Sequence, residues 1–175
     1  MKKHLIRLLA FSGTVVLLVL VLKGLNRLPL VVQDDFMRRY SDLDEIRGTL
    51  QMPSILVPSF FPQNLSWPPS TILAQGNPFP AVIMEFEKTG GKETVLLISQ
   101  STSEEFLPDD KIRIVEVKES VAYPLKGRNA LLTVGMCRNE EPCCGISWKE
   151  KEYRIHVLSR STPFELIKIA ESMLR

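Results

Sequence analysis

The sequence predicts an α+β domain that follows an N-terminal transmembrane helix. Three observations support this class. An apolar segment lies near the start of the 175-residue chain, short segments rich in β-branched residues follow from residue 81 onward, and an amphipathic segment with helix-capping residues ends the chain. We expect an antiparallel sheet of about six strands, with the C-terminal helix packed on one face of that sheet.

The N-terminal segment is predicted to be a membrane anchor. Fifteen uncharged residues lie between Arg7 and Lys23, and residues 5–25 supply 21 positions. This is enough to cross a bilayer if both charged side chains bend toward the lipid headgroups. A cleaved signal peptide is the alternative, because its apolar core is shorter. Residues 23–27, however, lack the small residues of a cleavage site. The expected partner of residues 5–25 is therefore the lipid bilayer.

Charge predicts the orientation of this anchor and the chemistry of the remaining chain. Basic residues are slightly more numerous before the apolar segment (Lys2, Lys3, Arg7) than after it (Lys23, Arg27). This favours a cytoplasmic N-terminus and a periplasmic or extracellular body. Residues 33–175 contain 17 basic and 20 acidic residues, a net charge of −3. A body of this charge, without a basic cluster, argues against nucleic acid as a partner.

Between the anchor and the sheet, the pattern predicts one short helix. Phe36, Met37, Tyr40 and Leu43 recur at roughly helical spacing within residues 34–50. We therefore divide the chain into three parts: a membrane anchor (1–30), a juxtamembrane amphipathic helix and linker (31–52), and an extracytoplasmic α+β domain (53–175).

The next segment is rich in proline, and it is expected to be extended or turning. Residues 53–80 contain seven of the twelve prolines, and proline is excluded from helix interiors and central strands. Four large apolar side chains lie in this segment: Phe60, Phe61, Leu65 and Trp67. Packing on the core of the same domain is one explanation. An apolar binding surface for a ligand or a partner is the other.

From residue 81 the apolar residues follow the short period of strands. The expected strands are 81–87, 93–100, 111–118, 129–137, 145–150 and 152–159. Gly90-Gly91 predicts a tight hairpin between the first two. Short connections between consecutive strands favour an antiparallel meander.

The last segment predicts a helix with defined ends. Thr162 suits the N-cap, Pro163 the first helical position, and Glu165 the third position of a capping box. The apolar positions form one broad stripe that suits a sheet face: Leu166, Ile167, Ile169, Ala170, Met173 and Leu174.

Three pieces of this sequence, in order, resemble a bacterial domain family of unknown function: VPSFFPQNLSWPPS, ISWKEKEYRIHVLS and ELIKIAESML. That family occurs in exported, membrane-anchored proteins, some of them anti-sigma-factor-like or of lipoprotein type. The resemblance spans about residues 53–174. It implies an exported α+β domain, and it brings no catalytic residues.

The cysteines are the most informative polar feature. Cys137, Cys143 and Cys144 lie at the facing ends of two expected strands. A disulfide from Cys137 to Cys143 or to Cys144 fits hairpin geometry and an oxidising compartment. Two other interpretations are open. One is a zinc site completed by His156 or Glu141, although the usual ligand spacing is absent. The other is a thiol redox switch, although the nearby carboxylates disfavour the thiolate.

The sequence shows none of the following common catalytic motifs. No nucleophile elbow, phosphate loop, dinucleotide-binding loop or metalloprotease motif occurs. His4 precedes the predicted anchor, so a hydrolase or oxidoreductase would need His156 with Cys143 or Cys144. We instead expect that the domain is not an enzyme. The expected role is binding, sensing or assembly, with no cofactor or metal.

Overall fold

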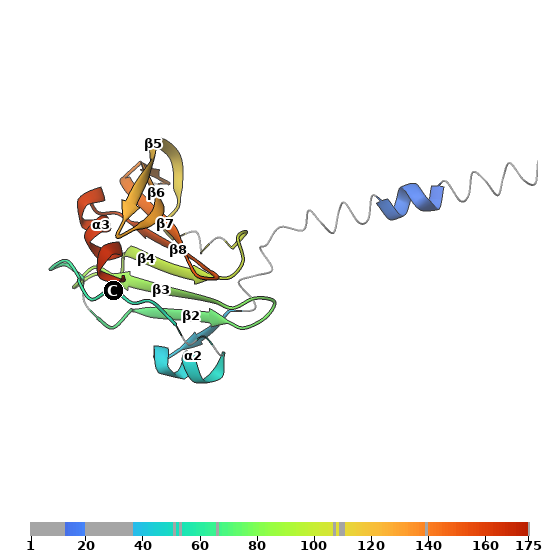
Figure 1. Cartoon of the computed structure of the whole chain (residues 1–175), viewed down its shortest axis with the longest axis horizontal. Helices are drawn as coiled ribbons and strands as arrows, with labels where there is room; N and C mark the ends of the chain where they lie inside the picture. The colour runs from blue at the N-terminus through green and yellow to red at the C-terminus, as the bar shows by residue number, and fades with distance from the viewer. Residues whose placement is uncertain are drawn as a thin grey trace, which may run out of the picture. The chain divides into compact units, whose positions relative to one another are not determined.

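The computed structural model describes residues 13–19, 37–50, 52, 54–65, 67–106, 108, 111–138 and 140–174. The chain forms two compact units, residues 1–36 and 37–175. In the first unit, residues 13–19 form a helix (Figure 1), and the side chains of these residues are exposed. Most of the predicted anchor lies outside the described residues, and in the described part no helix has the length and apolarity needed to cross a membrane.

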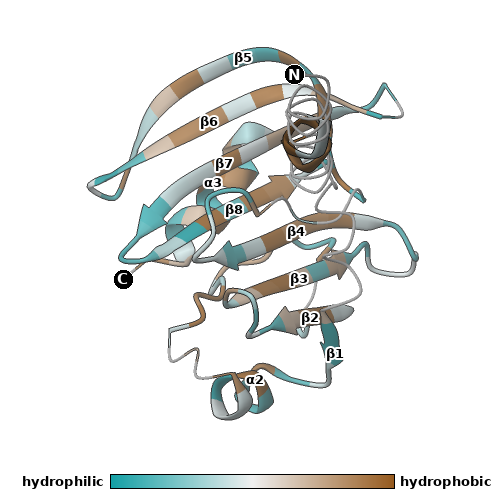
Figure 2. Ribbon diagram, turned by 90° about the vertical axis from the view of Figure 1, so that its right-hand side faces the viewer, coloured by the Kyte–Doolittle hydropathy of each residue, from teal (hydrophilic) through white to brown (hydrophobic). Residues whose placement is uncertain are grey.

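The second unit has the predicted α+β class. Its sheet contains eight antiparallel strands in the order β1-β2-β3-β4-β8-β7-β6-β5 (Figure 2). The strands are Arg38–Tyr40 (β1), Thr71–Gln75 (β2), Ala81–Glu87 (β3), Thr94–Ser101 (β4), Ile114–Leu125 (β5), Arg128–Cys137 (β6), Pro142–Glu150 (β7) and Tyr153–Ser159 (β8). The helices of this unit are Leu43–Thr49 (α2) and Pro163–Ser172 (α3).

The helix expected over residues 34–50 is shorter than predicted. Residues 34–36 lie outside the described residues, and α2 begins only at Leu43. The side chain of Asp42 caps α2 by accepting a hydrogen bond from the Glu45 N–H (2.8 Å). Residues 38–40 instead form β1, because their backbone pairs with β2. β1 and α2 thus belong to the same compact unit as residues 53–175.

The sheet has eight strands, whereas about six were expected. β1 is one addition, and β2 is the other. β2 lies inside the proline-rich segment, in a proline-free interval between Pro69 and Pro78. This interval pairs with β3 in a regular antiparallel register. The high proline content of residues 53–80 therefore led to the wrong expectation that this segment contains no strand.

The strands do not form a single meander. β2, β3 and β4 are consecutive neighbours, as are β5, β6, β7 and β8, but β4 pairs with β8. The chain therefore passes from β4 to the far edge of the sheet. From this connection, Phe106 and Ile112 pack on the sheet face opposite α3. We call this face the loop face and the other the helix face.

The C-terminal helix packs on the helix face as predicted. Leu166, Ile169 and Ala170 are fully buried in the main core cluster with residues from the sheet. The Thr162 hydroxyl accepts a hydrogen bond from the Glu165 N–H (3.3 Å), and Pro163 occupies the first turn. Local capping and a broad apolar stripe together define this helix.

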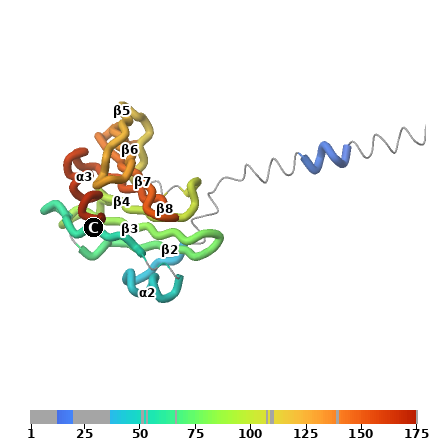
Figure 3. The backbone as a smooth tube through the Cα atoms, viewed as in Figure 1, coloured from blue at the N-terminus to red at the C-terminus, as the bar shows by residue number. Residues whose placement is uncertain are grey.

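Residues 54–65, which we call the strap, form an irregular segment whose path Figure 3 traces. Hydrogen bonds fasten the strap to the domain at three places. The Gln100 side chain pairs with the Leu56 backbone, accepting from its N–H (3.0 Å) and donating to its carbonyl (2.5 Å). The Ser59 hydroxyl donates to the Ser172 carbonyl at the end of α3 (3.0 Å). The Asn64 carbonyl accepts from the Thr89 N–H (2.9 Å). An irregular segment is thereby held at a defined position.

Candidate functional site

Cys137 and Cys143 form a disulfide with a Cα–Cα distance of 5.7 Å. They join the end of β6 to the start of β7. This confirms the predicted hairpin disulfide, with Cys143 as the partner of Cys137. Both cysteines belong to the core cluster of the loop face.

Cys144 is a free thiol on the other face of the sheet. It is 1% exposed, and its thiol donates to the Ser161 carbonyl (3.2 Å). Burial, and secondarily the charge of Glu165, raises the pKa of Cys144 to about 12. The thiol is therefore protonated and a poor nucleophile at neutral pH.

His156 does not meet a cysteine thiol. The strand register places it opposite Ser99 on β4 and Ser147 on β7. Cys144 lies opposite Ser159, three residues farther along β8, so Cys144 and His156 point to opposite faces of the sheet. Burial, with a smaller contribution from Arg154, lowers the pKa of His156 to about 4. The geometry does not support a cysteine–histidine pair.

The four apolar residues predicted as a binding surface divide into two groups. Leu65 is buried, and Phe61 packs against the core with its ring centroid 5.4 Å from that of Phe86. Trp67 and Phe60 are 48% and 40% exposed. Leu65 and Phe61 thus pack into the core. Trp67 is partly exposed, but its ring centroid lies 6.4 Å from that of the buried Phe86.

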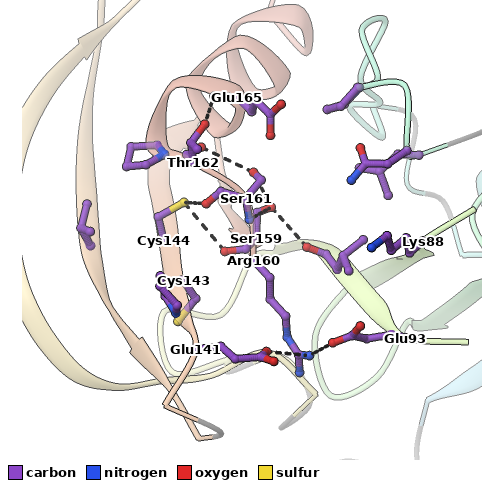
Figure 4. Close-up of a pocket in the computed structure, with 17 residues that line it drawn as sticks. Lys88, Glu93, Glu141, Cys143, Cys144, Ser159, Arg160, Ser161, Thr162 and Glu165 are labelled. Atoms are coloured by element: carbon purple, nitrogen blue, oxygen red, sulfur yellow. Dashed lines mark hydrogen bonds and ion pairs between the residues drawn. The ribbon is translucent and has the colours of Figure 1, made fainter. Parts of the chain in front are cut away.

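A cavity lies beside the strap (Figure 4). This strap pocket has a volume of about 590 Å³. Its walls come from the end of the strap, the β3–β4 turn, the start of β7 and the residues that lead into α3. The apolar part of the lining includes Pro62, Leu65, Val95, Val134, Pro142, Cys143, Cys144 and Pro163.

The hydroxyl groups of the pocket are engaged in structural hydrogen bonds. The Ser159 hydroxyl donates to the Val95 carbonyl (3.2 Å) and accepts from the Ser161 N–H (3.0 Å). Thr162 caps α3. These contacts join β4, β8 and the residues that lead into α3 into one wall.

Arg160 ties three loops together at one end of the pocket. Its guanidinium pairs with Glu93 of the β3–β4 turn and with Glu141 before β7 (3.3 Å). It also donates to the Lys111 carbonyl (3.2 Å) on the β4–β5 connection. Because two carboxylates pair with the guanidinium, the positive charge of Arg160 is neutralised within the domain.

Two other charged groups of the pocket lining are not compensated in this way. Lys88 reaches toward the pocket from the β3–β4 turn, and Glu165 lies on the α3 side (Figure 4). Neither side chain has an ion pair or a hydrogen bond with another residue in the described part of the chain. Besides the ion pairs of Arg160, the pocket thus has one unpaired positive group and one unpaired negative group on different walls.

Sequence reasoning found single components of this site. Cys144 and Leu65 were predicted site residues, and Thr162, Pro163 and Glu165 were recognised as a helix start. Lys88 and Arg160 were missed, because no local pattern marks the segments that converge on the pocket.

Over the described residues, no group of three or more histidine, cysteine, aspartate or glutamate side chains is arranged to hold a metal ion. Comparison with protein-family models, curated proteins and solved structures finds no match to this chain.

Proposed function

We propose that this chain is a single-pass membrane protein whose extracytoplasmic α+β domain binds a partner through the strap pocket, without catalysing a reaction. The pocket itself is the observation that carries this proposal. Its volume of about 590 Å³ is within the range of about 300–1,000 Å³ that is usual for ligand sites. Most of its lining surface is apolar, although polar and charged side chains also line it, and such a mixture is usual for ligand sites.

The chemistry of the pocket supports binding over catalysis. Its buried thiol has a pKa of about 12, and the Ser159 and Thr162 hydroxyls serve as structural hydrogen-bond partners. The imidazole of His156 projects from the loop face, whereas Cys144 lines the pocket on the helix face. A nucleophile and its base are therefore not brought together here.

Three observations support the membrane placement. Residues 13–19, inside the proposed span of residues 5–25, are helical, and Val16, Leu17 and Leu18 are exposed there. The Cys137–Cys143 disulfide suits an oxidising compartment. The basic residues before the span favour a cytoplasmic N-terminus. The resemblance to an exported, membrane-anchored family agrees with this placement.

Site-specific photo-crosslinking in intact membranes tests the binding role. A photoreactive residue replaces Asn64, which is exposed and lines the pocket. A matched control replaces Lys118, which is exposed on the edge strand β5. We expect a discrete crosslinked product from position 64 and none from position 118. Absence of any product from position 64, with normal expression, would contradict the proposal.

Membrane topology is tested separately. A cysteine placed near the N-terminus and one placed on β5 are probed with a membrane-impermeant thiol reagent in whole cells. We expect labelling only at β5. Labelling of the N-terminal cysteine alone would show that the orientation is reversed.

A further inference from the structure

We propose that the occupant of the strap pocket is an extended peptide segment of a partner protein. An acidic group of this segment faces Lys88, a basic group faces Glu165, and apolar side chains lie between them. This inference rests on the binding role proposed above, and it adds the chemical class and the orientation of the partner.

The first argument is the distribution of charge. Arg160 already pairs with Glu93 and Glu141, so it does not offer a free positive charge. The groups left to an occupant are Lys88 and Glu165, which have opposite signs and lie on different walls. An occupant with one kind of charge would be attracted by one wall and repelled by the other. An occupant with both charges, kept apart, is complementary to both.

The second argument is the apolar lining that the pocket has beside these two groups. Leu65, Val95 and Val134 belong to three different segments and line the same pocket. Protein–protein contacts often gain most of their affinity from a few apolar side chains seated in such pockets, with charged groups at the rim. A peptide supplies apolar anchors and separated charges on one backbone.

The third argument is that the walls are held in place before binding. The strap is fastened by Gln100 and Thr89, and the opposite wall by the Ser159 contacts. Arg160 links the loops at one end. A preorganised pocket loses little entropy on binding, which suits recognition of a flexible peptide.

The test uses the full chain in lipid nanodiscs. Short random peptides on a display library are selected against it, and binding of individual peptides is measured by fluorescence polarisation. We expect the selected peptides to carry an acidic and a basic residue flanking apolar positions. Lys88→Glu and Glu165→Lys should each weaken their binding by about tenfold or more.

The double reversal, Lys88→Glu with Glu165→Lys, provides the decisive comparison. It should restore binding to peptides in which the acidic and basic positions are exchanged. Lys118→Glu on β5 is the matched control, and it should leave binding unchanged. Glu165→Gln removes the charge without placing a cation in the first turn of α3. It should therefore weaken binding while lowering the melting temperature less than Glu165→Lys does.

Three results would overturn the inference. Selected peptides without a charge pattern, or binding unaffected by both reversals, would show that Lys88 and Glu165 do not recognise the occupant. Failure to select any peptide, while position 64 still crosslinks in membranes, would refute a peptide occupant and keep the binding role. A crosslinked product at position 64 that contains a lipid or a second copy of this chain would also refute a peptide occupant and keep the binding role.

Discussion

At the scale of single residues, Cys144 is the only thiol outside the disulfide, and burial controls its reactivity. Its pKa of about 12 lowers the thiolate fraction by about a thousandfold relative to an exposed cysteine at the same pH. We expect iodoacetamide at pH 8 to leave the native protein unlabelled and to label one thiol per chain after denaturation. Mass spectrometry without reductant measures this. Rapid labelling of the native protein would contradict the buried position of Cys144.

His156 is the second residue whose environment makes a prediction. Burial lowers its pKa from 6.5 to about 4, so below pH 6.5 the unfolded chain takes up a proton that the folded domain does not. Stability contributed by the neutral imidazole is therefore complete above pH 6.5. It is lost as the pH falls toward 4, by up to about 3 kcal/mol.

A comparison with His156→Gln isolates this effect, because the carboxylates titrate alike in both proteins. The free energy of unfolding is measured by urea denaturation at pH 7 and at pH 4.5. We expect the wild-type protein to lose more stability over this interval than the variant. Equal losses would mean that His156 is not held neutral.

At the scale of elements, the β6–β7 hairpin depends on its disulfide. The bond between Cys137 and Cys143 closes a short loop, which stabilises the fold by about 2–3 kcal/mol in the chain-entropy model. Replacing both cysteines by serine should lower the melting temperature by several degrees. Reductant should lower the melting temperature of the wild-type protein and leave that of the variant unchanged. A reductant effect of equal size in both would point to another cause.

The two faces of the C-terminal helix differ in burial, so substitutions on the two faces should have different effects on folding. Ile169 is 0% exposed, whereas its neighbour Lys168 is exposed. Ile169→Asp should prevent folding, because an unpaired buried charge costs several kcal/mol against a total stability of about 5–15 kcal/mol. Lys168→Asp should preserve a cooperative transition, measured by circular dichroism. A normally melting Ile169→Asp protein would disprove packing of this stripe.

At the scale of the whole molecule, the compact unit begins at Met37. We expect residues 37–175 to fold without the preceding segment, with a cooperative thermal transition. A fragment that starts at residue 53 lacks β1 and α2, including the buried Leu43 and Ile46, so it should be less stable. Equal melting temperatures of the two fragments would show that β1 and α2 do not contribute to the fold.

The parts of this protein that its sequence determines are those encoded by neighbouring residues. Thr162 and Pro163 mark the start of α3 within one turn, and the stripe through Leu166 and Ile169 predicts its buried face. Gly90 marks the β3–β4 hairpin. Cys137 and Cys143 are close in the chain, so hairpin geometry predicts their bond. In each case the residues that interact to form the feature lie within a few positions of one another in the sequence.

Tertiary structure alone decided the remainder. β1 exists because Arg38–Tyr40 finds β2 more than thirty residues away, and the same residues otherwise suit a helix. The pairing of β4 with β8 sets the sheet order and brings Glu93 to Arg160. The strap pocket follows from these pairings, since its walls come from segments that no local pattern connects. Burial and strand pairing between distant residues are properties of the folded chain, whereas caps, turns and apolar stripes are written within a few residues.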